Sequence, residues 1–299
     1  MALNQQTTPQ ANVSSNSTVP DEKFHPVLLG IYIVVFISGL ICFSLAVHVL
    51  KSSSTSITSI AVFNLIFTHF LFLLTIPFRI YYYSTHEWNM GTIWCKVVSS
   101  MIHVHMYMSF IFYVIILISR LLTFYHTAQN IPSFQKLHAL LVSAGVWIAV
   151  LVTVPCVLTF SYGKKAEDGN KTTNQCFTFA EDIESTTAKV LNYIVSTFII
   201  VATVVLTILQ ANILRVLYKR DREKCMVQQD FSAQLKSLCF ALIMVASFIP
   251  YHIFRLYYIE HLKLENINEV FLSLTTFNCL DTLTFLGRRT CFEWPFCKG

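Results

Sequence analysis

A few ionisable side chains interrupt long apolar segments of this sequence, and these are the residues that could do chemistry. His69 and Asp281 are each surrounded by apolar residues, a position where an ionisable group is costly and usually functional. Hydrolysis within such segments would need two carboxylates, or two histidines one helical turn apart that share a metal ion. Asp281 is the only carboxylate there, and His103 and His105 are two residues apart, so they diverge around a helix. We therefore expect no enzyme, no catalytic residue, no cofactor and no metal site.

Seven segments without Asp, Glu, Lys or Arg, apart from Asp281 in the last, must position these side chains. They are 27–50, 57–78, 97–119, 137–163, 190–214, 237–254 and 270–287. Each is about as long as a helix needs to cross a bilayer. The composition, 55% hydrophobic and 12% charged with a mean hydropathy of +0.58, excludes a water-facing surface. The sequence predicts an all-α membrane protein, a bundle of seven transmembrane helices with a short C-terminal interfacial helix.

The pieces between the segments set the orientation. If the N-terminus is outside, the inner pieces carry 12 Lys and Arg against four acids, and the outer pieces nine against 11. This basic bias follows the positive-inside rule, and the net charge of +5 needs no nucleic-acid partner. We expect a multi-pass plasma-membrane protein with an extracellular N-terminus at 1–26, a seven-helix domain at 27–287 and a cytoplasmic amphipathic tail at 288–299.

Covalent modification is expected on both sides of the membrane. Three N-x-S/T sequons fall in outer pieces and predict glycosylation of Asn12, Asn16 and Asn170. The tail contains Cys291 and Cys297 among basic and aromatic residues, which suits an interfacial helix with an acylated cysteine. Unmodified thiols are the alternative at these two positions.

Several stretches of the sequence, from the second predicted segment to the last, carry a family resemblance. They are FNLIFTHFLFLLTIPFR at 63–79, the stretch from Trp88 to Lys96, Arg120 placed 25 residues after Cys95, Trp147, FIPYHIFR at 248–255 and NCLDTLTF at 278–285. Together they resemble the rhodopsin-like, class A G protein-coupled receptors. The resemblance implies a receptor that passes an extracellular signal to heterotrimeric G proteins.

The resemblance also implies roles for individual residues. Cys95 and Cys176, the only cysteines in outer pieces, match the family's disulfide between the third helix and the second outer loop. Arg120 matches the cytoplasmic arginine that contacts the G protein, and Pro250 would kink the sixth helix into a hinge. The acid that normally precedes this arginine is Ser119 here. Asp230 lies where some relatives keep an acidic partner, so either it locks Arg120 or both charges are simply solvated.

The core departs from the family pattern at several positions. His69 stands where the family has a sodium-binding Asp, Phe248 where it has Trp, Thr282 where it has Pro and Phe285 where it has Tyr. One carboxylate beside an imidazole is a poor sodium cage. The hypothesis is that His69 pairs directly with Asp281 and replaces sodium. The alternative is a neutral His69 hydrogen-bonded to Ser109 or Asn278.

The outer halves of the helices suggest the ligand class. Ile102 stands where amine receptors keep Asp, which argues against a monoamine. The candidate pocket residues are Arg79, His103, Tyr107, Tyr251, His252 and Arg255. Guanidinium and imidazole donors suit phosphate or carboxylate, so we expect an anionic small molecule or lipid at Arg255 and Arg79. Alternatively, both arginines reach lipid headgroups or pair with Glu260, Glu265 or Glu269.

Three other functions stay open at this point. Histidines titrate near physiological pH, so the trigger could be a proton, received at His25, His86, His103, His105, His252 or His261. A seven-helix protein could also bind a ligand without signalling, or act as a heteromer partner. A transporter is disfavoured because the first and last three segments show no repeat.

Overall fold

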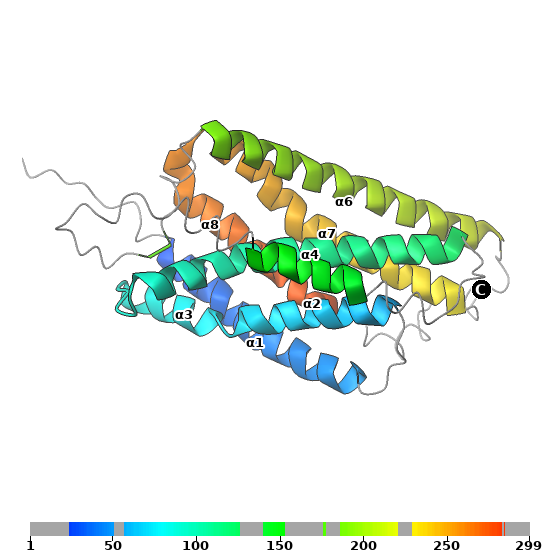
Figure 1. The fold of residues 1–299 in the computed structure, drawn as a ribbon, viewed down its shortest axis with the longest axis horizontal. Helices are drawn as coiled ribbons and strands as arrows, with labels where there is room; N and C mark the ends of the chain where they lie inside the picture. The colour runs from blue at the N-terminus through cyan, green and yellow to red at the C-terminus, as the bar shows by residue number, and fades with distance from the viewer. Residues whose placement is uncertain are drawn as a thin grey trace, which may run out of the picture.

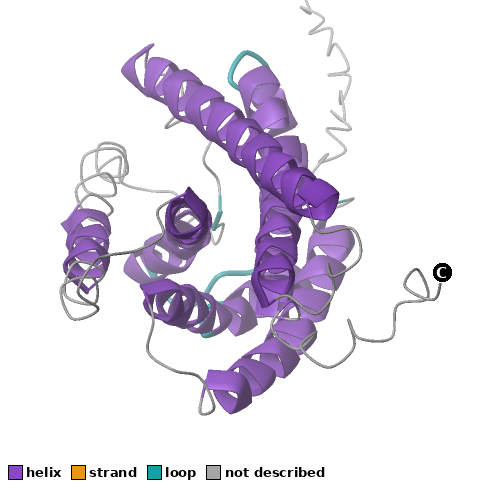
Figure 2. Ribbon diagram, turned by 90° about the vertical axis from the view of Figure 1, so that its right-hand side faces the viewer, coloured by secondary structure: helices purple, strands orange, loops and turns teal. Residues whose placement is uncertain are grey.

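A computed structural model describes residues 24–50, 57–125, 140–152, 176–177, 186–220, 229–282 and 284. Within these ranges every secondary-structure element is helical, and the helices run along one long axis (Figure 1, Figure 2). The elements are α1 (His25–Leu50), α2 (Ile57–Leu73), α3 (Ile76–Thr85), α4 (Thr92–Tyr125), α6 (Thr186–Arg220), α7 (Gln229–Tyr258), the 3₁₀ helix η3 (Leu262–Leu264), α8 (Glu265–Leu274) and the 3₁₀ helix η4 (Thr275–Thr282). A further helix, Leu140–Val152, lies between α4 and α6 in the chain.

Helix length and surface agree with the predicted membrane fold. Five helical stretches in the described ranges are long and apolar enough to span a bilayer: His25–His48, Ile60–Thr85, Thr92–Leu122, Thr186–Lys219 and Ala233–Tyr258. The shorter helix Leu140–Val152 falls inside the predicted fourth segment. Large apolar side chains such as Ile37, Ile41 and Phe198 are exposed on α1 and α6, where lipid would cover them. The predicted all-α membrane bundle is confirmed.

The second predicted segment is two helices, α2 and α3, where the sequence suggested one. Pro77 has no N–H to donate and its ring crowds the preceding turn, so α2 ends at Leu73 and Pro77 stands in the first turn of α3. Thr75 fills the gap, because its backbone N–H and its hydroxyl both donate to the carbonyl of Phe72, at 2.8 and 2.7 Å. The N–H of Leu74 also donates to the carbonyl of Phe70, at 3.2 Å, so both residues between α2 and α3 keep a backbone hydrogen bond.

The last predicted segment also differs from a single α-helix. Its first part, α8, begins at Glu265, and the chain continues as η4 from Thr275. The η4 sequence, TTFNCLDT, is rich in side chains that compete for backbone hydrogen bonds. Thr275 does so, since its hydroxyl donates to the carbonyl of Leu272 at 2.6 Å.

Most other helices extend past the predicted charge-free segments. α4, α6 and α7 each include charged residues at one or both ends, because long basic side chains can carry their charge to the membrane surface. α1 begins at His25, two residues before the predicted segment 27–50.

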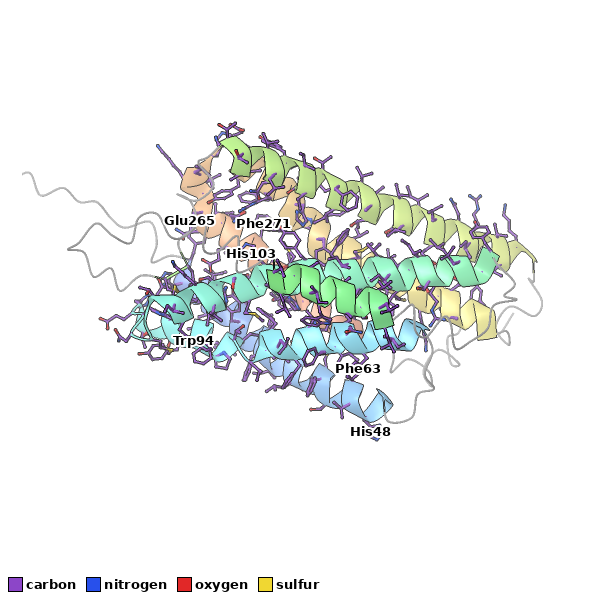
Figure 3. The ribbon with its side chains drawn as sticks, viewed as in Figure 1. His48, Phe63, Trp94, His103, Glu265 and Phe271 are labelled. Carbon is purple, nitrogen blue, oxygen red and sulfur yellow. A yellow bond between two sulfur atoms is a disulfide. The ribbon has the colours of Figure 1, made fainter. Side chains whose placement is uncertain are left out.

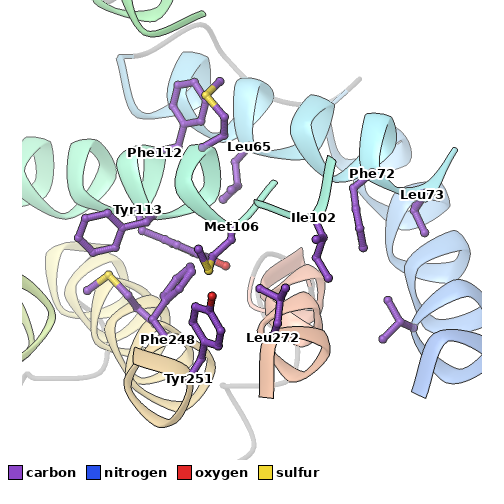
Figure 4. Close-up of a cluster of buried hydrophobic side chains, with 14 of the residues drawn as sticks. Leu65, Phe72, Leu73, Ile102, Met106, Phe112, Tyr113, Phe248, Tyr251 and Leu272 are labelled. Atoms are coloured by element: carbon purple, nitrogen blue, oxygen red, sulfur yellow. The ribbon is translucent and has the colours of Figure 1, made fainter. Parts of the chain in front are cut away.

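The core lies around α4, which packs against α2, α6, α7 and η4. Leu65, Ile102, Met106, Tyr113 and Phe248 meet there (Figure 4). Figure 1 shows the starts of α1, α4 and α8 at one end of the bundle, together with the end of α3. We call this the disulfide end. α4 and α6 finish at the opposite end.

Candidate functional site

A disulfide joins the first turn of α4 to the part of the chain that follows the helix Leu140–Val152. Cys95 and Cys176 are bonded with their Cα atoms 5.9 Å apart, across a sequence separation of 81. The pairing expected from the family resemblance is confirmed. The bond places Phe177 over the disulfide end, where its ring packs against Tyr82 and Trp88.

Arg79 of α3 is fully buried beneath this cover. Its guanidinium donates to the hydroxyl of Tyr32 at 3.0 Å and to the carbonyls of Val98 and Ser99 at 3.2 and 3.4 Å. The same guanidinium lies 3.4 Å from the carboxylate of Glu269 on α8, which forms an ion pair with it. Arg79 therefore ties α3 to α1, α4 and α8.

Two aromatic rings complete this cluster, which we call the Arg79 cluster. The guanidinium carbon of Arg79 lies 4.4 Å from the ring centroid of Phe177, a cation–π distance. The hydroxyl of Tyr83 donates to the Glu269 carboxylate. Of the two readings for Arg79, the structure matches the pairing with Glu269. Its charge is already compensated, and no exposed surface remains for a ligand.

Arg255 of α7 is in a different environment. Its Nε and Nη2 atoms donate to the side-chain oxygen of Asn192 on α6, at 3.2 and 3.1 Å, and its guanidinium lies 5.3 Å from the ring centroid of Tyr258. Within the described part of the chain, no carboxylate pairs with it. Glu260, one of the predicted alternatives, instead accepts from Tyr193 at 2.8 Å. Arg255 is thus an inward cation held by a neutral amide.

The other predicted pocket residues gather around Arg255. It lies close enough to His103, Tyr107 and His252 to interact with them electrostatically, and Tyr251 is buried beside His252. Nδ1 of His252 is 3.2 Å from the hydroxyl of Ser196. Figure 3 places His103 on α4 in the half of the bundle that holds the disulfide.

A second polar cluster lies deeper, between α2, α4 and η4. Nε2 of His69 is 3.2 Å from the Asp281 carboxylate, the contact that the sequence hypothesis expects. Nδ1 of His69 is 2.8 Å from Nε2 of His105, and the hydroxyl of Tyr113 donates to Asp281 at 2.8 Å. The alternative partners of His69, Ser109 and Asn278, form no hydrogen bond with it, because their side chains are buried with no hydrogen-bond partner among the described residues.

Arg120 lies half-buried near the opposite end of α4. Among the described residues it has neither an ion pair nor a hydrogen-bond partner. Asp230 lies in the first turn of α7, but the placement of its side chain is outside what the structure describes, so the predicted lock stays a prediction.

Phe248 and Pro250 lie in the C-terminal half of α7. Phe248 is fully buried, and its ring makes edge contacts with Phe110 and Tyr113 at centroid distances of 5.8 and 6.1 Å. The helix continues through Pro250.

Several predicted positions lie outside the described residues. They are the sequons at Asn12, Asn16 and Asn170, Phe285, the tail at 288–299, and its Cys291 and Cys297.

The sequence interpretation missed some partners that the structure supplies. Asn192 could have been noticed as a polar residue in an apolar segment, as could Tyr113 from its place one turn after Ser109. Glu269 is one of three acids that the sequence allows as partners of Arg79, and nothing in the sequence distinguishes it from the other two. His105 is one of several histidines, and no sequence pattern indicates that it bonds to His69.

Comparisons with known proteins agree with this geometry. A family model described as 7 transmembrane receptor (rhodopsin family) matches residues 27–282. Probable G-protein coupled receptor 141 of Homo sapiens is 36% identical over 287 residues, 93% of this chain and 93% of that protein. The amino-acid sequence of residues 101–120, together with His69 and residues 281–285, also suggests a likeness to this relative.

Two more distant relatives extend the comparison. Probable G-protein coupled receptor 34 of Pan troglodytes is 26% identical over 300 residues, 93% of this chain and 77% of that protein. Lysophosphatidic acid receptor 6 of Homo sapiens is 28% identical over 170 residues, which cover 56% of this chain and 48% of that protein. Because the family model matches most of its length and a relative is 36% identical over 93% of it, this chain belongs to the rhodopsin family of seven-transmembrane receptors.

Proposed function

We propose that this chain is a plasma-membrane receptor, with its N-terminus outside, that passes an extracellular signal to heterotrimeric G proteins through Arg120. The observation that carries the proposal is the position of Arg120. It is a half-buried cation at the end of α4 away from the disulfide, with no described partner to hold it. An arginine in this state is free to contact an incoming protein, and family membership supplies the class of that protein.

Replacing Arg120 with alanine is expected to abolish ligand-free G protein activation. The measurement is activation of each Gα class as a function of receptor surface density. Wild-type receptor should give a signal that rises with surface density in at least one Gα class. The reason is that Ser119 and His69 replace two acids, which in the family normally precede the cytoplasmic arginine and bind sodium. Arg215→Ala, which removes an exposed arginine on α6, is the matched control.

The same experiment separates the alternatives. A density-dependent signal that survives Arg120→Ala would contradict the role of this arginine. Silence in every Gα class, with ligand still bound at the cell surface, would favour a non-signalling binder or heteromer partner. Substrate flux across vesicles that contain the purified protein would instead indicate a transporter.

The ligand of the proposed receptor is an anion that contacts Arg255. This arginine is 8% exposed and has a neutral partner in Asn192, so its charge is not compensated within the described residues. An incoming phosphate or carboxylate can supply the missing charge with charge-assisted hydrogen bonds. One relative is named as a receptor for lysophosphatidic acid, which makes that lipid the first probe.

Changing Asn192 to aspartate is expected to weaken the response to an anionic agonist by roughly 10- to 100-fold, because loss of a charged hydrogen bond costs about 1.5 to 3 kcal/mol. The new carboxylate would pair with Arg255 and leave it in place but neutralised. The measurement is the concentration dependence of G protein activation by lysophosphatidic acid, with monoacylglycerol as the phosphate-free control compound. Asn192→Ala, which frees Arg255, should retain the response. Equal potency in wild type, Asn192→Asp and Arg255→Ala would exclude this pocket.

A further inference from the structure

Two histidines face each other at the disulfide end of the bundle. His25 is the first residue of α1, and His86 directly follows the last residue of α3, so both lie at the end where Figure 1 shows α1 starting and α3 finishing. We propose that these two side chains bind a transition-metal cation between their Nδ1 atoms, with Zn²⁺ as the ion to test. Nothing in the sequence pairs them, because they are 61 positions apart and lie outside the apolar segments from which we expected no metal site.

The two imidazole rings present their nitrogens to each other. The ring centroids are 4.6 Å apart and the ring planes are inclined by only 8°, whereas the two Nδ1 atoms are 2.6 Å apart. Because the nitrogens are so much closer than the centroids, both Nδ1 atoms lie between the rings and point toward each other. One of them carries a hydrogen and the other accepts it.

A metal ion can take the place of this hydrogen. Zn–N bonds are about 2.0 to 2.1 Å long, so two nitrogens on a tetrahedral ion lie about 3.3 Å apart and the rings would separate by roughly 0.7 Å. The ring that now donates would lose the hydrogen from Nδ1 and carry one on Nε2, which is the other neutral tautomer. Both rings would then bind the ion as neutral imidazoles, the form in which histidine is a metal ligand.

The fold holds both rings in position before an ion arrives. The backbone of His86 is left-handed, with φ 60°, and its N–H donates to the carbonyl of Tyr82 at 2.8 Å. The ring of His25 packs against the rings of Tyr82 and Tyr83, at centroid distances of 5.8 and 5.3 Å. A pair that is already arranged loses less conformational freedom on binding.

Water can reach the pair and complete the coordination of the ion. His86 is exposed and His25 is half-buried. In the part of the chain that the structure describes, no third His, Cys, Asp or Glu joins them, so water would fill the remaining positions, as it does in open zinc sites. Imidazole nitrogen suits Zn²⁺ and Cu²⁺, whereas Mg²⁺ and Ca²⁺ prefer oxygen. The site therefore predicts selective and reversible binding.

A bound ion would join α1 to α3 beside the Arg79 cluster. Tyr83, on which the His25 ring packs, donates to the carboxylate of Glu269, and its ring stacks on that of Phe177 at 5.9 Å. The ion would thus strengthen the fold at the disulfide end. Only the access of extracellular ions to the site rests on the proposed function. Zinc binding by the purified protein is measured without a G protein, so the two proposals fail separately.

The first test is the amount of zinc bound by purified receptor in detergent, measured by competition with a colorimetric zinc chelator. Wild-type receptor should compete for Zn²⁺, and excess Mg²⁺ should not displace the ion. Zn²⁺ should also raise the thermal midpoint by about 3 °C or more, since an ion that binds the folded protein stabilises it, and EDTA should reverse the rise. Wild-type receptor that binds no zinc would overturn the proposal without any variant.

Two variants locate the ion at this pair. His25→Phe keeps a ring against Tyr82 and Tyr83 but removes the nitrogen, and His86→Asn keeps a residue type that tolerates the left-handed backbone. Each should bind one zinc ion fewer than wild type, or bind it at least tenfold more weakly. His261→Gln, which changes an exposed histidine at the end of α7, is the matched control and should bind as wild type does. Equal zinc binding in wild type and in both variants would place the ion elsewhere and overturn the proposal.

Discussion

Replacing Arg79 with leucine should lower the thermal midpoint of the receptor by about 10 °C, because breaking a buried ion pair costs roughly 3 to 5 kcal/mol. The change removes the partner of Glu269 and leaves a carboxylate beneath the cover formed by Phe177. It also removes the donors to Tyr32 and to two α4 carbonyls. The same loss should appear as low surface expression in cells. The measurement is the midpoint of the purified protein in detergent.

A double-mutant cycle shows whether the ion pair is the cause. Glu269→Leu alone should also be destabilising, since it leaves Arg79 buried with its charge uncompensated. The double variant Arg79→Leu/Glu269→Leu should be more stable than either single variant, because no unpaired charge remains. Arg215→Leu, which removes an exposed arginine, is the control and should have little effect. Additive losses in the double variant would show that the two side chains act independently.

Loss of the disulfide should destabilise the receptor by about 3 to 5 kcal/mol, since it closes a long loop. The two cysteines are 81 positions apart. Cys95→Ser, Cys176→Ser and the double variant should all lower the midpoint by the same amount, because each removes the same single bond. The measurement is again the thermal midpoint, with surface expression as a second readout.

Reduction provides a matched control for these cysteine variants. Wild-type receptor treated with a thiol reductant should lose as much stability as the variants, and the variants should not respond to it. Cys42→Ala, which changes a free buried cysteine, should respond to reductant as wild type does. Additive effects of the two serine substitutions would argue that the thiols contribute through packing and not through the bond.

Much of the fold was predictable because a bilayer allows few alternatives. Charge-free segments of adequate length indicate spanning helices, and the described helices follow them. The ends were not predictable by that rule, since charged residues at the ends of α4 and α6 remain helical. The proline itself signals the break before Pro77, but dividing the chain at charged residues takes no account of proline. The 3₁₀ geometry of η4 depends on competition between Thr hydroxyls and the backbone, which composition does not resolve.

The sequence predicted which residues form the candidate site, but not which of these residues contact one another. The resemblance and the residue types selected His69, Asp281, Arg79 and Arg255, and the structure brings the first two into contact. The sequence could not show which arginine has its charge compensated by an acid, because Glu269 is 190 residues from Arg79. The two arginines carry the same charge, and only the three-dimensional arrangement gives one an acid and the other an amide.

The length of α4 has a mechanical consequence. Cys95 lies near its start and Arg120 near its finish, about 37 Å apart at 1.5 Å per residue, and Thr92–Tyr125 contains neither Gly nor Pro that would let it bend. The disulfide ties one end of this helix to Cys176. We therefore expect α4 to move as one rigid body, so that a displacement of its disulfide-bonded end would be carried directly to Arg120 without bending.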